Sequence, residues 1–185
     1  MLNLMLTDSP CFLYKRKVGL LKMVYHIREM YKTDWDQVKE IYQQGIDTNL
    51  ATFQTECPSF EEFDQSHLED CRYVAVDGYT VVGWAVLSAV SSRCVYRGVA
   101  EVSIYVRDSY KGKKVGTQLL THLIAKSEEH GIWTLQSAIM EDNLASIRLH
   151  EKCGFRKVGY RERIGKDRFG VWRNTVLMER RSNIF

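Results

Sequence analysis

The chain has 185 residues, of which 45% are hydrophobic and 26% are charged, and its formal net charge is +3. These values are typical of a single globular domain that is long enough to bury a core. The 26 lysines and arginines are spread along the chain among 23 acidic residues. We therefore expect no nucleic-acid partner, because proteins that bind nucleic acids gather their basic residues on one face.

The cysteines and the apolar segments bear on the cellular compartment. The five cysteines are an odd number, and no two of them stand in a C-x-x-C pair. We therefore expect neither a disulfide framework nor a metal site, and we expect the reducing cytoplasm as the compartment. No apolar run approaches the length of a membrane span, so a membrane partner is not expected either.

The first 22 residues differ in pattern from the rest of the chain. Their apolar part, Met1–Leu13, is interrupted by an acid and a proline, and the positive residues follow it, which reverses the order of a secretory signal. We interpret residues 1–22 as a poorly ordered extension, with a short surface helix as the alternative. Residues 23–185 are then one domain, and either Met1 or Met23 is the residue at which translation begins.

The first half of the chain predicts two helices and three strands. Apolar residues recur at helical spacing in two places, and in both a polar residue that favours a helix N-cap stands before them. The dipeptide Asp77-Gly78 separates two apolar runs, which predicts a β-hairpin. In chain order, we expect a strand at 24–30, a helix at about 36–46 after an N-cap at Thr33-Asp34, a helix capped by Ser59 with Phe60, Phe63 and Leu68, and strands at 72–77 and 81–87.

The second half alternates strands with helices. Within the strand expected at 99–106, Glu101 is the lone acid, and it shares one face with Ser103 and Tyr105. Strands that come first and a βαβα unit that follows them indicate the α+β class. After 99–106 we expect a loop at 111–116, a helix at about 117–129, a strand at 135–139, a helix at 146–153 that ends at Gly154, and strands at 158–164 and 174–179.

The loop between the 99–106 strand and the following helix has the features of an anion site. Its position points backbone N–H groups at the space in front of the helix, where the macrodipole adds partial positive charge. Gly112 and Gly116 leave the backbone open, and Lys111, Lys113 and Lys114 add charge. The loop is neither a P-loop nor a dinucleotide fingerprint. Taken alone, it fits a phosphate site and a basic connection with turn glycines equally well.

Two motifs in this half resemble those of the GNAT acetyltransferase superfamily. The pyrophosphate loop of that family reads R/Q-x-x-G-x-G/A, and this chain has K-G-K-K-V-G at 111–116. It departs from the pattern at Lys111, which replaces Arg or Gln, and at Lys114, which replaces the central glycine. The second motif, N-x-x-S/A-x-x-x-Y/H-x-x-x-G-F, is complete at Asn143, Ser146, His150 and Gly154-Phe155.

Within this superfamily, the chain resembles the phosphinothricin and methionine sulfone acetyltransferases over about residues 24–180. The run Ala100–Val106 is similar to the A-E-x-S-x-Y-V strand of that group, and Phe169–Trp172 is similar to its H/F-G-x-W stretch. The run Phe53–Glu56 resembles its F-R-T-E segment, with Gln54 in place of the arginine.

The resemblance implies a fold and an activity that periodicity alone does not. It implies the GNAT fold, with a mixed central sheet of about seven strands, a splay between the two central strands and about four flanking helices. It also implies acetyl-CoA as the donor, a small amino acid or analogue as the amine acceptor, a homodimer, and no metal.

The resemblance also gives roles to individual residues. Amine acetylation needs a neutral amine, and Glu101 stands where the family has its catalytic glutamate, which serves as general base. His150 stands where many members have a tyrosine that protonates the leaving thiolate, so it is expected to act as that acid or to contact the acceptor. Without the resemblance, Glu101 would be interpreted as an exposed strand residue and His150 as a structural histidine.

The remaining implied residues bind the two substrates. Backbone N–H groups of the strand end are expected to stabilise the charge on the thioester oxygen. Asn143 is expected to bond the pantetheine arm or to shape the splay, and as a helix cap it can do both. The cofactor-binding set is Ile104, Tyr105, Val106, Gly112, Lys113, Lys114, Val115, Gly116, Thr117 and Asn143, and the acceptor-binding set is Phe53, Thr55 and Arg93.

Two other functions remain open at this point. One is a protein or peptide N-acetyltransferase of the same fold, which an open peptide groove would favour over a pocket closed by residues 53–56 and Arg93. The other is a non-catalytic acyl-CoA-binding module, in which Glu101→Gln would leave coenzyme A binding intact and no activity would be lost.

Overall fold

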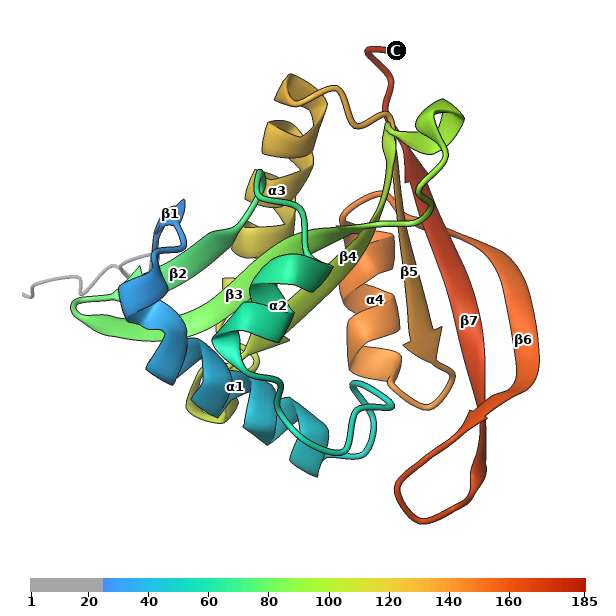
Figure 1. Ribbon diagram of the computed structural model, residues 1–185, viewed down its shortest axis with the longest axis horizontal. Coiled ribbons are helices and arrows are strands. Elements are labelled where there is room, and N and C mark those ends of the chain that lie inside the picture. Colours follow the sequence, from blue (N-terminus) through green and yellow to red (C-terminus); the bar gives the residue numbers. More distant parts are fainter. Residues whose placement is uncertain (1–24) are drawn as a thin grey trace, which may run out of the picture.

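The computed structural model describes residues 25–185, so the predicted extension at 1–22 lies outside the described residues. The described part forms one seven-stranded mixed sheet with four α-helices, which confirms the predicted α+β class (Figure 1). The elements are β1 (His26–Glu29), α1 (Trp35–Asp47), α2 (Phe60–Ser66), β2 (Tyr73–Asp77), β3 (Thr80–Ala89), β4 (Val99–Val106), α3 (Val115–Glu129), β5 (Thr134–Met140), α4 (Leu144–Lys152), β6 (Arg156–Lys166) and β7 (Trp172–Arg181).

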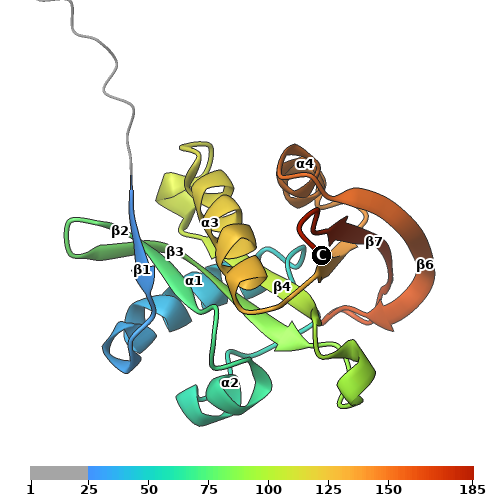
Figure 2. The ribbon, with the colours of Figure 1, turned by 90° about the horizontal axis from the view of Figure 1, so that it is seen from above.

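The strand order is β1-β2-β3-β4-β5-β7-β6. All neighbouring strands are antiparallel except β4 and β5, which run parallel at the centre. Seen from above, α3 and α4 cover one face of the sheet, and α1 and α2 cover the other (Figure 2). None of the helices within 25–185 is long and apolar enough to cross a membrane.

Each face of the sheet has its own core, which follows from the alternation of side chains along the strands. Toward α3 and α4, Ala100 and Val102 of β4 pack with the buried helix residues Leu119, Leu120 and Leu123. Toward α1 and α2, the core includes Val38, Ile41, Phe63, Val74, Val76, Val81, Trp84 and Val86. Because β4 contributes to both cores, its position is fixed from both sides.

Three local expectations differ from the structure. Asp34 does not cap α1 with its side chain, because its carboxylate pairs with Arg28 and accepts the Tyr31 N–H at 2.8 Å. Leu68 lies outside α2, which ends at Ser66. The hairpin turn is Gly78-Tyr79 rather than Asp77-Gly78, because Asp77 still pairs with Thr80 across the ladder.

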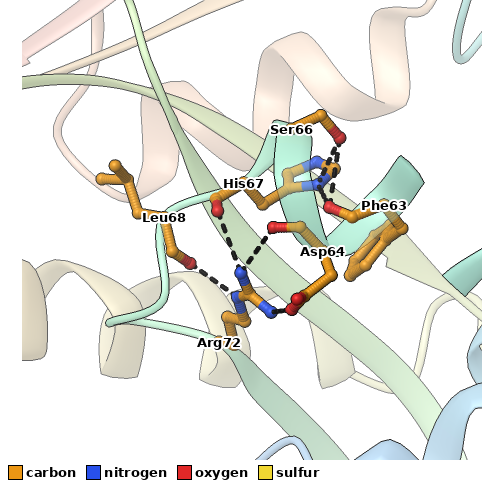
Figure 3. A network of polar contacts seen from close by, with 6 residues as sticks. All are labelled: Phe63, Asp64, Ser66, His67, Leu68 and Arg72. Atoms are coloured by element: carbon orange, nitrogen blue, oxygen red, sulfur yellow. Dashed lines mark hydrogen bonds and ion pairs between the residues drawn. The ribbon is translucent and has the colours of Figure 1, made fainter. Parts of the chain in front are cut away.

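An arginine closes the C-terminal end of the short helix α2 (Figure 3). The last carbonyl groups of a helix have no partner inside the helix. The Arg72 guanidinium donates to the carbonyl oxygens of Asp64 and His67 at 2.9 Å and of Leu68 at 2.6 Å, and it also pairs with the Asp64 carboxylate. The His67 ring bonds the Phe63 carbonyl at 2.7 Å. This network holds α2 against β2.

We predict that Arg72→Ala lowers the free energy of unfolding by about 2 kcal/mol, because several charge-assisted hydrogen bonds are lost together. Arg156→Ala is the matched control, since its ion pair with Glu179 is largely exposed and is worth less than about 1 kcal/mol. Urea denaturation measures both changes. Equal losses in the two variants would contradict this role for Arg72.

Candidate functional site

The parallel pair at the centre of the sheet opens into a cleft. Only Val99–Glu101 of β4 pairs with β5, and its partners there are Thr134–Gln136. Beyond these residues the two strands diverge (Figure 1). The cleft between them has a volume of about 990 Å³ and is lined by both strands, the start of α3, α4 and the segment 48–54. A smaller cavity of about 360 Å³ beside β1 and α2 contains none of the predicted site residues.

One end of the cleft is the start of helix α3. Lys114 is the N-cap residue, and within residues 25–185 no side chain caps this helix end. The first N–H groups of a helix have no acceptor within the helix, so the N–H groups of Val115, Gly116 and Thr117 face the cleft without a partner there. Such an uncapped start beside lysines is suited to bind a phosphate or diphosphate.

Two positions of the loop have a structural role, Lys114, which departs from the family pattern, and Gly116, which matches it. Lys114 adopts the left-handed conformation with φ of +67°, which is why glycine suits this position. At position 116 a side chain would crowd the neighbouring helix, because a Cβ there would lie 3.1 Å from Leu149 of α4. Gly116 therefore allows close contact of α3 with α4, in addition to leaving the backbone open.

We predict that Lys114→Gly raises the free energy of unfolding by about 1 kcal/mol, because it relieves a left-handed residue that carries a Cβ. Lys113→Gly removes the same charge at a position without positive φ, so it lowers the free energy of unfolding by about 0.5 kcal/mol instead. Thermal unfolding of both variants measures the difference. Stabilisation by neither variant would contradict the assigned strain.

Glu101 lies where β4 and β5 separate. Its direct partner on β3 is Ser88 and its partner on β5 is Gln136. It shares its face of β4 with Ser103 and Tyr105, whose ring stacks on buried Trp84 at 4.5 Å between ring centres. This is the α1 and α2 face of the sheet. The Glu101 carboxylate is half-buried, lines the cleft, and has no ion-pair or hydrogen-bond partner within residues 25–185.

His150 reaches the cleft from α4, on the opposite face. Its Nδ1 lies 2.8 Å from the Ser146 carbonyl oxygen, and because a carbonyl only accepts, Nδ1 carries the proton. Its Nε2 is buried and has no partner in the described structure. Burial lowers the pKa of His150 below its ordinary value of 6.5, so the neutral ring dominates at neutral pH. In this state Nε2 accepts a hydrogen bond but has no proton to give.

We predict that folding stability decreases as the pH falls from about 7 to about 5, and decreases less in His150→Gln. The folded pKa of His150 is lowered, so the unfolded chain binds a proton in this range that the folded chain does not. His67, whose pKa burial also lowers, keeps part of the slope in the variant. Denaturant titrations across this range measure it, and identical slopes would contradict burial of a neutral His150.

Asn143 connects the start of α4 to the segment that borders the cleft. Its Oδ1 accepts the Ser146 N–H at 3.2 Å and so caps α4, and its Nδ2 donates to the Leu50 carbonyl at 3.1 Å. The same segment is held from the other side, because Asn49 donates to the buried Asp167 carboxylate at 2.8 Å. Asn143 therefore both caps a helix and positions the 48–54 segment over the cleft.

The structure brings most of the predicted site residues into this one cleft. Those that line it are Glu101, Ile104, Tyr105, Val106, Gly112, Lys114, Val115, Gly116, Thr117, Asn143, His150 and Phe53. Three predicted residues are not among the lining residues. Lys113 lies over the Tyr110 ring, Thr55 is exposed, and the Arg93 guanidinium lies over the Tyr96 ring.

Comparison with known proteins agrees with this geometry. The sequence profile described as "Acetyltransferase (GNAT) family" matches residues 25–155. The chain belongs to this family. Phosphinothricin N-acetyltransferase of Alcaligenes faecalis is 32% identical to it over 177 residues, which covers 90% of this chain and 87% of that protein.

Other GNAT relatives match in sequence or in structure. L-methionine sulfoximine/L-methionine sulfone acetyltransferase of Pseudomonas aeruginosa is 39% identical over 84 residues, or 45% of this chain, and the match spans only about half of that protein, 48%. The GNAT superfamily phosphinothricin acetyltransferase of Sinorhizobium meliloti, solved in complex with AcCoA, is 28% identical with a TM-score of 0.78. That match covers 86% of this chain and 89% of the solved chain. The GNAT fold expected from the sequence is thereby confirmed.

Sequence reasoning missed several residues that line the cleft of this GNAT protein. Ser137, Arg161 and Thr175 belong to it, although their strands were predicted. Whether a strand residue faces the cleft depends on the register between distant strands, and β6 has irregular register at two places. The alternation within 158–164 or 174–179 alone does not reveal which side chains face Glu101.

Proposed function

We propose that this protein transfers the acetyl group of acetyl-CoA to the amine of a small amino acid or analogue, of the phosphinothricin, methionine sulfone or methionine sulfoximine type. The observation that carries the proposal is the free Glu101 carboxylate at the point where β4 and β5 separate, in the same cleft as the uncapped start of α3. The start of α3 suits a diphosphate, and Glu101, at the point where β4 and β5 separate, is suited to act as a base.

The residues present fit acetyl-CoA as the donor of the acetyl group. The N–H groups at Val115–Thr117 and Lys114 would hold the diphosphate. Beyond Glu101, β4 has no partner strand on the β5 side, so backbone groups of Ile104–Val106 on that side are available to the pantetheine arm and the thioester oxygen. The rest of the cofactor set expected from the sequence lines the same cleft, apart from Lys113.

Glu101 is proposed as the general base. Its carboxylate accepts a proton from the acceptor's ammonium, directly or through a water molecule, and leaves the neutral amine that can attack. The N–H groups of the strand end stabilise the negative charge that develops on the thioester oxygen. As the new C–N bond forms, the C–S bond breaks, and the proton that the attacking nitrogen loses passes to the leaving thiolate, directly or through a water molecule. His150, neutral and protonated on Nδ1, offers a hydrogen-bond acceptor at Nε2 on the other face of the sheet.

The closed acceptor side supports a small acceptor over a peptide. The 48–54 segment is fastened to the β6–β7 hairpin by the Asn49–Asp167 bond, and a Cβ at Gly165 would lie 3.1 Å from the Phe53 ring. This contact narrows the acceptor side of the cleft, which suits a small acceptor better than a peptide. Arg93 does not take part in the closure, since it lies outside the cleft.

We also propose that the protein acts as a homodimer in the cytoplasm. The described cysteines Cys57, Cys71, Cys94 and Cys153 are free thiols, which suits a reducing compartment. The β6–β7 hairpin exposes large apolar side chains, which support a subunit contact: Val158, Tyr160, Ile164, Phe169, Val171 and Trp172. Light scattering with size-exclusion chromatography measures the mass, and a monomer at micromolar concentration would contradict the dimer.

The activity is tested by incubating the protein with acetyl-CoA and a panel of amines, and measuring the release of free thiol. The panel contains methionine sulfone, methionine sulfoximine, phosphinothricin, the common amino acids and a short peptide. Turnover of amino acid-type acceptors is expected. Turnover of the peptide alone would favour the peptide acetyltransferase, and binding of coenzyme A without any turnover would favour the non-catalytic module.

We predict that Glu101→Gln lowers kcat/KM by about 10²- to 10⁴-fold at neutral pH, because it removes the base and keeps the size of the side chain. Binding of coenzyme A, measured by calorimetry, stays within about twofold, since the diphosphate contacts are at the far end of the cleft. Glu69→Gln, an exposed glutamate outside the cleft, serves as control. A Glu101→Gln enzyme with nearly full activity would eliminate Glu101 as the base.

A further inference from the structure

The face of the sheet on which Glu101 lies also carries an arginine. Across the ladders, Glu101 is paired with Gln136, Met140 with Thr175, and Thr175 with Arg161. Directly paired residues point to the same face, and so do residues two or four apart on one strand. Gln136 and Met140 are four apart on β5, so Glu101, Thr175 and Arg161 all belong to the same face.

Arg161 is the cation of strands β6 and β7 for which the described structure shows no polar or aromatic partner. The other arginines and lysines of these two strands contact carboxylates, an aromatic ring or backbone carbonyl oxygens. These are Arg156 and Lys157 with Glu179 and Glu151, Arg163 with Glu162, Lys166 over Trp172, Arg173 with Asp142 and Asp167, Arg180 with Glu128, and Arg181 with carbonyls. Within residues 25–185, no ion pair or hydrogen bond engages the Arg161 guanidinium, and the residue is exposed and lines the cleft.

The hydroxyl group next to Arg161 is also unsatisfied. Thr175 is only 3% exposed, its Oγ1 has no hydrogen-bond partner in the described structure, and the residue lines the same cleft. A buried hydroxyl without a partner destabilises a fold, and such groups in native proteins call for an explanation. An acceptor oxygen that approaches from the cleft would give this hydroxyl a partner after rotation about one bond.

The other cations of the cleft lie elsewhere. Lys111 and Lys114 come from the loop before α3, and Lys152 comes from the last turn of α4, on the side where the α3 start suits a diphosphate. On the side of Phe53, the neighbouring residue Gln54 is neutral. Within the described part of the cleft, Arg161 is therefore the cation that shares a face with the proposed base.

We propose that Arg161, with the Thr175 hydroxyl beside it, forms the subsite for the carboxylate of the amine acceptor. This inference rests on the proposed function and names the group that would select amino acids over simple amines. A guanidinium offers parallel N–H donors that match the two oxygens of a carboxylate. In an amino acid the carboxylate and the amine are attached to the same carbon, so a carboxylate held at β6 keeps the amine on the face of Glu101.

The test compares two acceptors that differ only in their acid group, methionine sulfone and its α-carboxamide. We expect Arg161→Gln to lower kcat/KM for methionine sulfone by about 10- to 100-fold, mainly through KM. The same variant leaves kcat/KM for the carboxamide within about twofold. KM for acetyl-CoA and the thermal midpoint of unfolding remain close to those of the wild type, which separates a binding role from a folding defect.

Matched variants sharpen the comparison. Arg161→Lys keeps the charge but not the planar pair of donors, so we expect an intermediate loss. Thr175→Val keeps the shape and removes the hydroxyl, and we expect it to raise KM for methionine sulfone severalfold without loss of stability, since the removed group is unpaired. Arg156→Gln, on the same strand with its own partner Glu179, is expected to behave as the wild type.

The failures of the two proposals give different results. Wild-type enzyme that neither acetylates nor binds any amine of the panel would overturn the proposed function and this subsite with it. Turnover of methionine sulfone with an equal loss for acid and carboxamide in Arg161→Gln, or with no loss, would overturn the subsite alone. A carboxylate-dependent loss in Arg93→Gln but not in Arg161→Gln would assign the acid group to Arg93 instead.

Discussion

The limited pairing of β4 with β5 is the constraint on which the rest of the site depends. The two strands share a ladder for only three residue pairs, which end at Glu101 and Gln136. Backbone polar groups in a sheet need partners, and beyond this point those of β4 that face β5 have none from the sheet. β4 stays paired with β3 as far as Val106, and the cores on both faces of the sheet hold β4 in place. β4 therefore stays extended and cannot fold back to give its unpaired backbone groups a partner.

The same opening separates two chemical environments. Toward α3 and α4, the cleft has the uncapped helix start, the lysines of the preceding loop and the neutral His150. Toward α1 and α2, it has Glu101 and, through the register of β5, β7 and β6, Arg161. In the proposed reaction, a donor and an acceptor that enter from opposite faces meet at the end of the β4–β5 ladder, where Glu101 lies. The Asn143 and Asp167 contacts hold the 48–54 segment over this meeting point.

Much of the fold and part of the site could be predicted from the sequence, for physical reasons that differ between elements. The strand at 99–106 and its two faces follow from simple alternation, whereas the glycines and lysines before the helix fit a phosphate site and a basic connection equally well until the family resemblance is added. The splay came only from the family resemblance, and the order of the strands was not predicted, because local patterns carry no information on pairing between distant strands. Arg161 was missed for that reason. Lys114, in the left-handed conformation, shows that a residue that departs from a motif can keep the backbone conformation of the motif at some cost in free energy. Arg93, which the resemblance implied as an acceptor-binding residue, lies over the Tyr96 ring and does not line the cleft.

The most direct test of the central claim is a crystal structure of the protein with coenzyme A and methionine sulfone bound together. We expect the diphosphate at the N–H groups that begin α3, the sulfur between β4 and β5 beyond Glu101, and the amine of the acceptor on the Glu101 face. A complex in which coenzyme A lies outside the opening between β4 and β5, or in which the acceptor occupies the α3 and α4 face, would contradict it.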